Sequence, residues 1–176
     1  ESRARAQALI LAGLVFSGET KIAKAGQTLL LEAPLEVRGR DHPWVSRGGI
    51  KLAHAIDHFA LDPAGVTAMD IGSSTGGFTD VLLQKGVEHV FAVDSGTNQL
   101  AWKLRNDHRV VVMEKTNARS LTGSAFPPPF APVDLVVIDC SFISLRKILP
   151  AAVALSKPVG KLVMLIKPQF EAGKTE

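Results

Sequence analysis

The stretch Ala68-Met69-Asp70-Ile71-Gly72-Ser73-Ser74-Thr75-Gly76-Gly77-Phe78 decides the fold class. The apolar run 66–71 ends in a series of small residues, and a helical pattern follows over residues 78–85. This order predicts a strand, a glycine-rich turn and a helix. Glycines let the backbone approach a ligand closely, and the start of a helix offers N–H groups that have no partner within the helix. The turn is therefore predicted to bind a polar ligand.

An acidic residue ends the next apolar run, His89-Val90-Phe91-Ala92-Val93-Asp94. In a dinucleotide-type half-fold, an acid at this place accepts hydrogen bonds from ribose hydroxyls. The turn lacks both the lysine of G-x-x-x-x-G-K-[ST] and the spacing G-x-G-x-x-G, so pyrophosphate-binding loops fit less well. We predict a nucleoside-bearing cofactor without a pyrophosphate, with S-adenosylmethionine as the leading candidate. A tight turn that binds no ligand is the alternative.

Strands and helices are predicted to alternate through most of the chain. Strands are expected near residues 66–71, 89–94, 110–114, 133–139 and 161–167, and helices near 78–86, 97–105 and 143–156. A further helix, which carries Leu52, Ala55, Ile56 and Phe59, precedes the first strand. This alternation is typical of an α/β protein with a parallel, doubly wound, Rossmann-like sheet that helices cover on both faces. The triplet Pro127-Pro128-Pro129 predicts a rigid loop before the fourth strand.

The first 37 residues predict a small α+β unit of their own. A helix is expected over Arg3–Leu14, and short strands are expected at 15–16 and 28–31 with a turn at 17–19. The unit begins abruptly inside its helix, so we expect its usual start to be missing.

A polar, basic link over residues 38–45 follows this unit. Its glycine and proline break regular structure, so the domain boundary is predicted here. The second domain is then predicted to cover residues 46–176.

Composition favours an ordinary globular protein of the cytoplasm. Hydrophobic residues make up 46% of the 176 residues and charged residues 21%. No apolar run approaches the length of a membrane span and no signal peptide opens the chain, so no stable membrane association is expected. The single Cys140 cannot form an internal disulfide, which suits a reducing compartment.

The net charge of +3 is concentrated at the front of the chain. Residues 1–51 contain eight Lys and Arg against five Asp and Glu, whereas residues 52–176 contain twelve of each kind. A nucleic-acid footprint would produce this distribution, and so would a solubilising surface.

Chemically active side chains are expected to gather at one edge of the sheet. Asp70, Asp94 and Asp139 each follow a predicted strand, and ligand sites in open α/β sheets lie at the carboxyl ends of strands. Lys167 ends a further apolar strand, and Lys51 lies on the helix that precedes the first strand. The alternatives are a helix-capping role for Asp139 and ordinary surface positions for both lysines.

Six motifs follow one another along the chain. They are S-R-G-G-I-K-L at 46–52, D-I-G-S-S-T-G-G-F-T-D at 70–80, Q-L-A-W-K-L-R-N-D at 99–107, T-N-A-R at 116–119, V-I-D-C-S-F-I-S-L at 137–145 and I-K-P-Q-F-E at 166–171. Together they resemble the TlyA (hemolysin A-type) family of ribosomal-RNA ribose 2′-O-methyltransferases. The front segment S-R-A-R-A-Q-A-L-I-L-A-G-L-V-F-S-G resembles the small RNA-binding domain named after ribosomal protein S-four.

The resemblance implies an FtsJ-like S-adenosylmethionine methyltransferase sheet with a Lys-Asp-Lys-Glu active site. By motif position the first three members are Lys51, Asp139 and Lys167. The Glu belongs to a later strand that this chain is expected to lack, and Glu171 is too near Lys167 to replace it. A neutral Lys167 would help to remove the proton of the ribose hydroxyl. Lys51 would orient the ribose, while Asp139 would hold both lysines and counter the sulfonium charge.

The remaining expectations concern ligands. Residues predicted to bind the cofactor are Asp70, Gly72, Ser73, Ser74, Thr75, Gly76, Gly77, Phe78, Asp94, Asn117 and Asp139, with Asn117 at the adenine edge; no metal is expected. Phosphate contacts to ribosomal RNA or ribosomal subunits are predicted for Arg3, Arg5, Lys21, Lys24, Arg38, Arg40 and Arg47, and the implied target is cytidine. Two other functions stay open: a cytolysin, and an RNA-binding assembly factor without catalysis.

Overall fold

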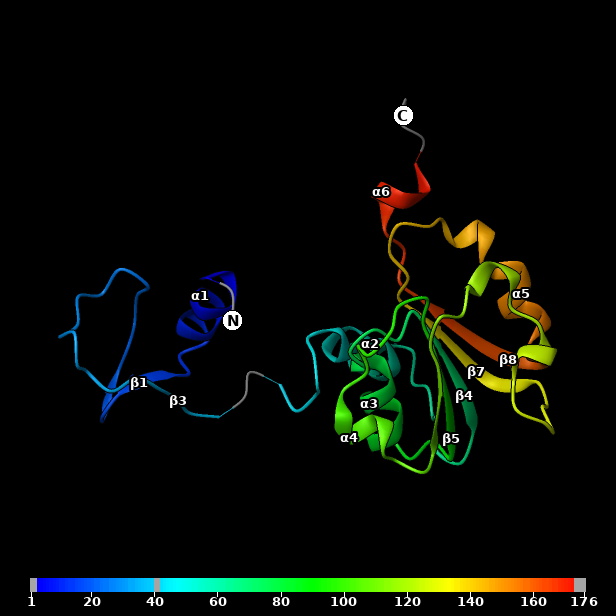
Figure 1. Cartoon of the computed structure of the whole chain (residues 1–176), viewed down its shortest axis with the longest axis horizontal. Coiled ribbons are helices and arrows are strands. Elements are labelled where there is room, and N and C mark those ends of the chain that lie inside the picture. The colour runs from blue at the N-terminus through cyan, green and yellow to red at the C-terminus, as the bar shows by residue number, and fades with distance from the viewer. Residues whose placement is uncertain (1–2, 40–41, 173–176) are drawn as a thin grey trace. The chain divides into compact units, whose positions relative to one another are not determined.

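A computed structural model describes residues 3–39 and 42–172 of the chain (Figure 1). It divides the chain into two units, Glu1–Pro43 and Trp44–Glu176. The division falls inside the predicted link 38–45. Each unit has its own sheet and its own hydrophobic cluster, so we describe them separately.

The second unit is built on a five-stranded sheet with the order β6-β5-β4-β7-β8. Its strands are β4 (Thr67–Ile71), β5 (His89–Val93), β6 (Val110–Met113), β7 (Val133–Ile138) and β8 (Ser156–Met164). All four strand pairs are parallel, which confirms the predicted sheet. The chain runs outward from β4 to β6 and then returns to place β7 on the other side of β4. Open α/β sheets bind ligands at such a reversal, beyond the carboxyl ends of the strands.

Helices cover both faces of this sheet (Figure 1). The helices that cover the faces are α2 (Gly48–His58), α3 (Gly77–Gln84), α4 (Trp102–Arg105) and α5 (Leu149–Ala154), whereas α6 (Pro168–Glu171) lies away from the sheet (Figure 1). The short turns η1 (Ala118–Ser120) and η2 (Gly123–Ala125) lie between β6 and β7, and η3 (Leu145–Lys147) precedes α5. Successive strand side chains point to opposite faces. In β4, Ala68 therefore packs in one cluster with Leu52 of α2, whereas Met69 packs in the other cluster with Ala152 of α5.

Several predicted elements of the second unit differ from the structure in their bounds. The helix expected over 97–105 is only α4, because Asn98 has a positive φ of 54° that a right-handed helix cannot contain. The helix expected over 143–156 is divided into η3 and α5. Strand β8 begins at Ser156, ahead of the predicted residue 161, because an irregularity opposite Val133 and Leu135 accommodates the additional residues. Phe59, predicted for the apolar face of α2, follows the helix and is exposed.

The first unit pairs the helix α1 (Arg3–Leu11) with a small antiparallel sheet of order β2-β1-β3. Its strands are β1 (Val15–Ser17), β2 (Thr20–Lys21) and β3 (Glu36–Val37). The turn predicted at 17–19 is confirmed, because Ser17 lies opposite Thr20 across a two-residue connection. The strand predicted at 28–31 is wrong: Leu30 and Leu31 are exposed, and β3 takes the place beside β1. Helix α1 ends before residue 14 because Gly13 has a φ of +71°.

Candidate active site

The glycine-rich turn joins the end of β4 to the start of α3. The backbone N–H groups of Gly72 and Ser73 both donate to the Val93 carbonyl oxygen, at 2.9 and 3.1 Å, which fixes the turn against the end of β5. Gly72 has a φ of +84°, and a Cβ added there would lie 3.0 Å from the Asp139 carbonyl oxygen. Glycine is therefore required where the chain segments after β4 and β7 approach each other.

Two further glycines of the turn serve packing. A Cβ added to Gly76, whose φ is +93°, would lie 2.3 Å from Leu104 Cδ1 and 2.8 Å from Leu100 Cδ1. A Cβ on Gly77 would lie 2.3 Å from Ser46 Oγ. A side chain at Gly76 would therefore point toward Leu100 and Leu104 of the hydrophobic core, and Gly76 does not line the crevice in which we predicted it.

Asp70 lies beneath the turn. Its Oδ2 accepts hydrogen bonds from the Thr79 backbone N–H at 2.9 Å and from Thr79 Oγ1 at 2.7 Å, which fixes the first turn of α3. Its Oδ1 is buried and has no hydrogen-bond partner within residues 3–39 and 42–172. Burial raises the pKa of this carboxyl to about 7, against the opposing effect of the Thr79 hydrogen bonds. Asp70 thus supports the turn from inside and is not exposed at the crevice, where we predicted it.

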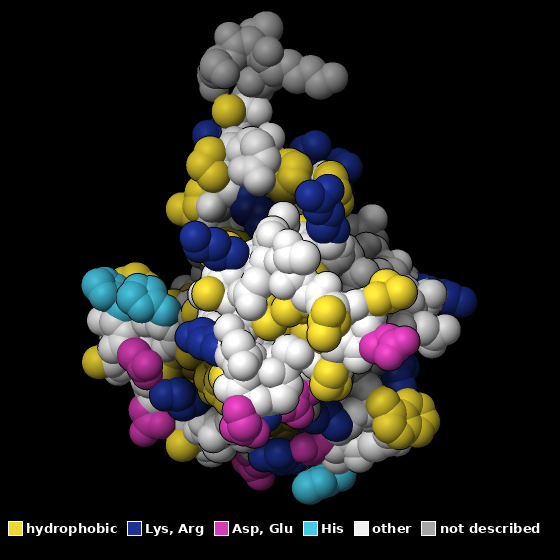
Figure 2. Space-filling model, turned by 90° about the vertical axis from the view of Figure 1, so that its left-hand side faces the viewer, with side chains coloured by type: hydrophobic (Ala, Val, Ile, Leu, Met, Phe, Trp, Pro, Cys, Tyr) yellow, Lys and Arg dark blue, Asp and Glu magenta, His cyan; other side chains and the backbone are white. Residues whose placement is uncertain are grey.

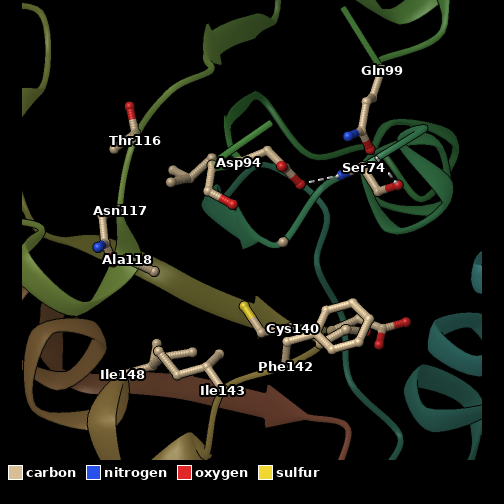
Figure 3. Close-up of a pocket in the computed structure, with 15 residues that line it drawn as sticks. Ser74, Asp94, Gln99, Thr116, Asn117, Ala118, Cys140, Phe142, Ile143 and Ile148 are labelled. Atoms are coloured by element: carbon tan, nitrogen blue, oxygen red, sulfur yellow. Dashed lines mark hydrogen bonds between the residues drawn. The ribbon is translucent and has the colours of Figure 1, made fainter. Parts of the chain in front are cut away.

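A first cavity of about 480 Å³ opens beyond the ends of β4, β5 and β7 (Figure 3). Asp94 stands on its polar side, opposite the apolar side chains of Ile143 and Ile148. The Asp94 carboxylate is fixed in place, because Oδ2 accepts from the Ser74 backbone N–H at 2.8 Å and Oδ1 accepts from the Gly96 backbone N–H at 2.7 Å. Each oxygen keeps a further lone pair with which it can accept a ligand hydroxyl.

Asn117 also lines this first cavity. Its side-chain oxygen accepts from the Arg119 backbone N–H at 3.0 Å and so caps η1. The cap fixes the side chain and leaves the amide NH₂ group as the part that can donate to a ligand.

Cys140 forms part of the wall of the same cavity. Burial, together with the nearby carboxylates of Asp70 and Asp94, raises the pKa of its thiol to about 12. The thiol is therefore neutral at physiological pH and acts as a small apolar wall residue, not as a nucleophile.

A second cavity of about 310 Å³ adjoins the first. Ser73, Thr75, Gly77 and Phe78 of the turn line it, and Gly72, Ser74 and Asp139 are shared between the two cavities. The predicted turn residues thus lie at the crevice, apart from Asp70 and Gly76.

Lys51, Asp139 and Lys167 come together in this second cavity. Lys51 Nζ lies 3.2 Å from Asp139 Oδ2, and Lys167 Nζ lies 2.5 Å from Asp139 Oδ1. Lys167 Nζ also donates to Ser141 Oγ at 2.8 Å. The exposed side-chain fraction is 49% for Lys51 but only 17% for Lys167, so Lys167 is the more enclosed amine. Asp139 does not cap the next helical turn, since the N-cap of η3 is Ser144.

Comparison with known proteins places this arrangement in a family. The model of the FtsJ-like methyltransferases matches residues 44–176. The chain is 49% identical to YqxC of Bacillus subtilis, a match that covers 99% of this chain and 61% of that protein. It is also 49% identical to the 16S/23S rRNA (cytidine-2′-O)-methyltransferase TlyA of Mycobacterium tuberculosis, over 98% of this chain and 64% of that protein. A protein of Streptococcus thermophilus named as a hemolysin has a solved structure with a TM-score of 0.77 and 44% identity, over 99% of this chain and 64% of its own.

The chain belongs to the FtsJ-like methyltransferase family. It spans about three-fifths of the length of these two curated relatives. Within residues 3–39 and 42–172 of this FtsJ-like chain, no helix is long and apolar enough to cross a membrane. The same described residues contain no group of three or more His, Cys, Asp or Glu side chains that could hold a metal ion.

Sequence reasoning missed Asp80, a buried acid of the FtsJ-like unit. Its Oδ2 accepts from the Val45 backbone N–H at 2.7 Å, and Lys103 Nζ lies 3.0 Å from its Oδ1. Asp80 therefore connects α3 both to α4 and to the segment that leads into α2. The available signal was an acid in the first turn of a helix that is otherwise buried.

The residues predicted to contact RNA differ in their surroundings. Arg3, Lys21, Lys24 and Arg47 are exposed, whereas Arg40 and the side chain of Arg5 lie outside the described parts of the chain. The Arg38 guanidinium is engaged within the first unit: it pairs with Glu36 and with Glu19, and it lies 4.7 Å from the centre of the Phe16 ring. In the lower half of the face drawn in Figure 2, Lys and Arg side chains are interspersed with Asp and Glu.

Proposed function

We propose that this chain carries the catalytic site of a ribosomal-RNA methyltransferase that transfers a methyl group to the ribose 2′-hydroxyl of cytidine. The observation that carries the proposal is the pairing of Lys51 and Lys167 with a single carboxylate, Asp139, beside the first cavity. The name of the TlyA relative supports cytidine in ribosomal RNA as the substrate. A cytoplasmic location is part of the same proposal.

The residues of the first cavity fit S-adenosylmethionine. The fixed Asp94 carboxylate suits a ribose diol, while Ile143 and Ile148 offer apolar surface for an adenine ring. When bound, this cofactor supplies an electrophilic methyl group on a positively charged sulfur. Asp94 and Asp139 both line the cavity, and their carboxylates would counter the positive charge of the bound cofactor.

The chain's own residues would position the substrate hydroxyl and hold its proton. A ribose hydroxyl is a very weak acid, so a nearby base must take its proton during the reaction. Lys167 Nζ, beside Asp139 and Ser141, would receive it in the neutral form, after the amine has given up its own proton to solvent. Lys51 lies on the other oxygen of Asp139 and is exposed enough to contact the ribose or its phosphate. Holding the amine and the hydroxyl in this geometry lowers the entropic part of the activation barrier.

The test is methyl transfer by the full-length protein to ribosomal RNA from cells that lack the modification. We expect transfer from S-adenosylmethionine to a cytidine 2′-oxygen, located by mapping ribose methylation. The RNA from a strain in which the gene has been deleted should lack the same mark. Cofactor binding without any ribose methylation on rRNA or intact subunits would refute the proposal.

Asp94→Ala should weaken S-adenosylhomocysteine binding by roughly 1.5–3 kcal/mol, the usual contribution of a hydrogen bond to a charged group. The variant loses both the ribose acceptor and the contact that fixes the Ser74 N–H. Isothermal titration calorimetry measures the change. Asp62→Ala is the matched control, because Asp62 also accepts a backbone N–H, from Ala64 at 3.0 Å, in a different turn. Equal affinity of Asp94→Ala and wild type would exclude Asp94 from the cofactor site.

We further propose that the first unit anchors the RNA. The first unit, residues 1–43, contains six Lys and Arg against five Asp and Glu, and the side chains of Arg3 and Lys24 are exposed and so accessible to phosphates. Phosphate contacts release counterions, so binding to ribosomal RNA should weaken steeply with salt. Arg3→Glu with Lys24→Glu should lower affinity and flatten the salt slope by about one unit per lost contact, while cofactor affinity stays unchanged. An unchanged salt slope in filter-binding titrations would contradict the anchor.

A further inference from the structure

The segments that follow β7 and β8 run side by side beyond the edge of the sheet. The Leu165 N–H donates to the Ile138 carbonyl oxygen at 2.9 Å and so extends the strand pairing past the end of β8. Further along, Lys167 reaches across to Asp139 and Ser141. These contacts join the two segments at the level of the lysine.

A second set of contacts, here called the second junction, joins the same two segments one helical turn later; the contacts of Lys167 form the first junction. The Glu171 carboxylate accepts from Ser144 Oγ and from the Leu145 backbone N–H, both at 2.7 Å. These two donors lower the pKa of Glu171, so the carboxylate is ionised at neutral pH. The Phe142 and Phe170 rings lie between the two junctions, with their centres 5.4 Å apart.

We propose that Glu171 is a positioning residue that holds Lys167 against Asp139. The inference rests on the proposed function and extends it to a residue that does not contact the reacting atoms. Lys167 and Glu171 stand at the two ends of α6, which is a single turn stabilised by a hydrogen bond from the Phe170 N–H to the Lys167 carbonyl oxygen at 2.9 Å. Fixing Glu171 to η3 therefore fixes the backbone from which Lys167 extends.

Lys167 needs the support of Glu171 because a lysine side chain is long and flexible. A long, flexible amine loses conformational entropy when it is held in one position, so other contacts must hold it there. Strand β8 ends at Met164, so the strand pairing alone does not fix the backbone at Lys167. With Glu171 bound to Ser144 and Leu145, the loop that carries Ser141 and the turn that carries Lys167 keep one spacing.

The test compares the reactivity of the Lys167 amine in full-length wild type, Glu171→Ala and Glu171→Gln. Acetylation by a water-soluble active ester, followed by peptide mass spectrometry, reports each lysine separately, with Lys161 of β8 as the internal reference. Glu171→Ala should raise Lys167 acetylation about fivefold, since loss of about 1 kcal/mol of restraint changes a population by that factor. Its kcat for methyl transfer should fall about 10–100-fold, with cofactor affinity unchanged.

Glu171→Gln should restore acetylation and turnover close to wild type. The amide oxygen can still accept from the Leu145 N–H, and the amide NH₂ can donate to the Ser144 hydroxyl. Asp57→Ala is the matched control, because it removes another carboxylate, one that pairs with Lys85 at 3.0 Å between α2 and α3. This control should leave both measurements unchanged.

A melting temperature that falls in Glu171→Ala while Lys167 acetylation stays at the wild-type level would overturn the proposal. It would leave Glu171 as a cap of η3 only. If Glu171→Ala does not fold, Ser144→Ala removes one of the two contacts and is judged by the same acetylation readout. If acetylation rises as expected but the wild-type protein methylates no RNA, the positioning role stands and the proposed function falls.

Discussion

Lys167→Ala in the full-length protein is expected to reduce methyl transfer by about 10²–10⁴-fold, the range that general acid–base groups contribute. The reason is geometric: Lys167 Nζ is the more enclosed of the two amines on Asp139, and Lys51 contacts the other carboxylate oxygen. Lys51→Ala should have a smaller effect, since Lys51 is half exposed. Single-turnover methylation of ribosomal RNA measures both. Cofactor affinity should stay near wild type in each variant.

Lys157→Ala provides the matched control for this prediction. Lys157 also lies on β8 and also pairs with an aspartate of β7, because its Nζ lies 2.5 Å from Asp134 Oδ1. The ion pair is therefore of the same kind but stands near the opposite end of the strands. We expect Lys157→Ala to turn over at the wild-type rate. Wild-type turnover by Lys167→Ala would refute the proposed role of the lysine.

Asp70→Asn should remove a pH dependence from the stability of the protein. Burial raises the pKa of Asp70 from 3.8 to about 7 in the folded state. Between these values the folded protein holds a proton that the unfolded chain has lost, so the free energy of unfolding falls as pH rises toward 7. Asparagine cannot ionise, so the free energy of unfolding of the variant does not fall with pH in this way. From about pH 5 to about pH 8 the variant should therefore gain about 3 kcal/mol relative to wild type, at 1.36 kcal/mol per pKa unit.

Urea unfolding at the two pH values measures this difference, and Asp107→Asn controls for the substitution. The hydrogen bond from Arg109 lowers the pKa of Asp107 to about 2. Asp107 is then ionised in both the folded and the unfolded state above about pH 5. The free energy of unfolding of Asp107→Asn should therefore differ from that of wild type by the same amount at both pH values. If the difference in free energy of unfolding between Asp70→Asn and wild type were also the same at both pH values, the buried carboxyl would not be protonated in the folded protein.

The strands and the position of the crevice could be predicted because their signals are local. Val133–Ile138 is a continuous apolar run that ends in an acid, and a parallel sheet brings such ends to one edge. Placing Asp139 beside Lys51, 88 positions away in sequence, depended on the family resemblance, because Lys51 lies on a helix and the strand-end rule does not reach it. Exact lysine–carboxylate distances could not be predicted, since they depend on the rotamers of long side chains.

Other features depended on tertiary contacts that leave no local pattern. Gly76 suggested ligand contact, but the limit on its size comes from Leu100 and Leu104 of a segment that lies more than twenty positions later. The exposed leucines 30 and 31 have the apolar character of a strand, yet β3 occupies the edge that they would need. Spacing alone could exclude Glu171 as the fourth member of the Lys-Asp-Lys-Glu set, but its contact with η3 required the fold.

The two adjoining cavities separate charge within a short distance. The first carries the Asp94 carboxylate, whereas the second adds two amines around Asp139. A cationic small molecule and a polyanion would thus be sorted into neighbouring compartments by electrostatics before any specific contact is made. Methyl transfer turns a sulfonium into a neutral thioether, so the reaction itself would cancel part of the attraction that retained the donor and favour its exchange.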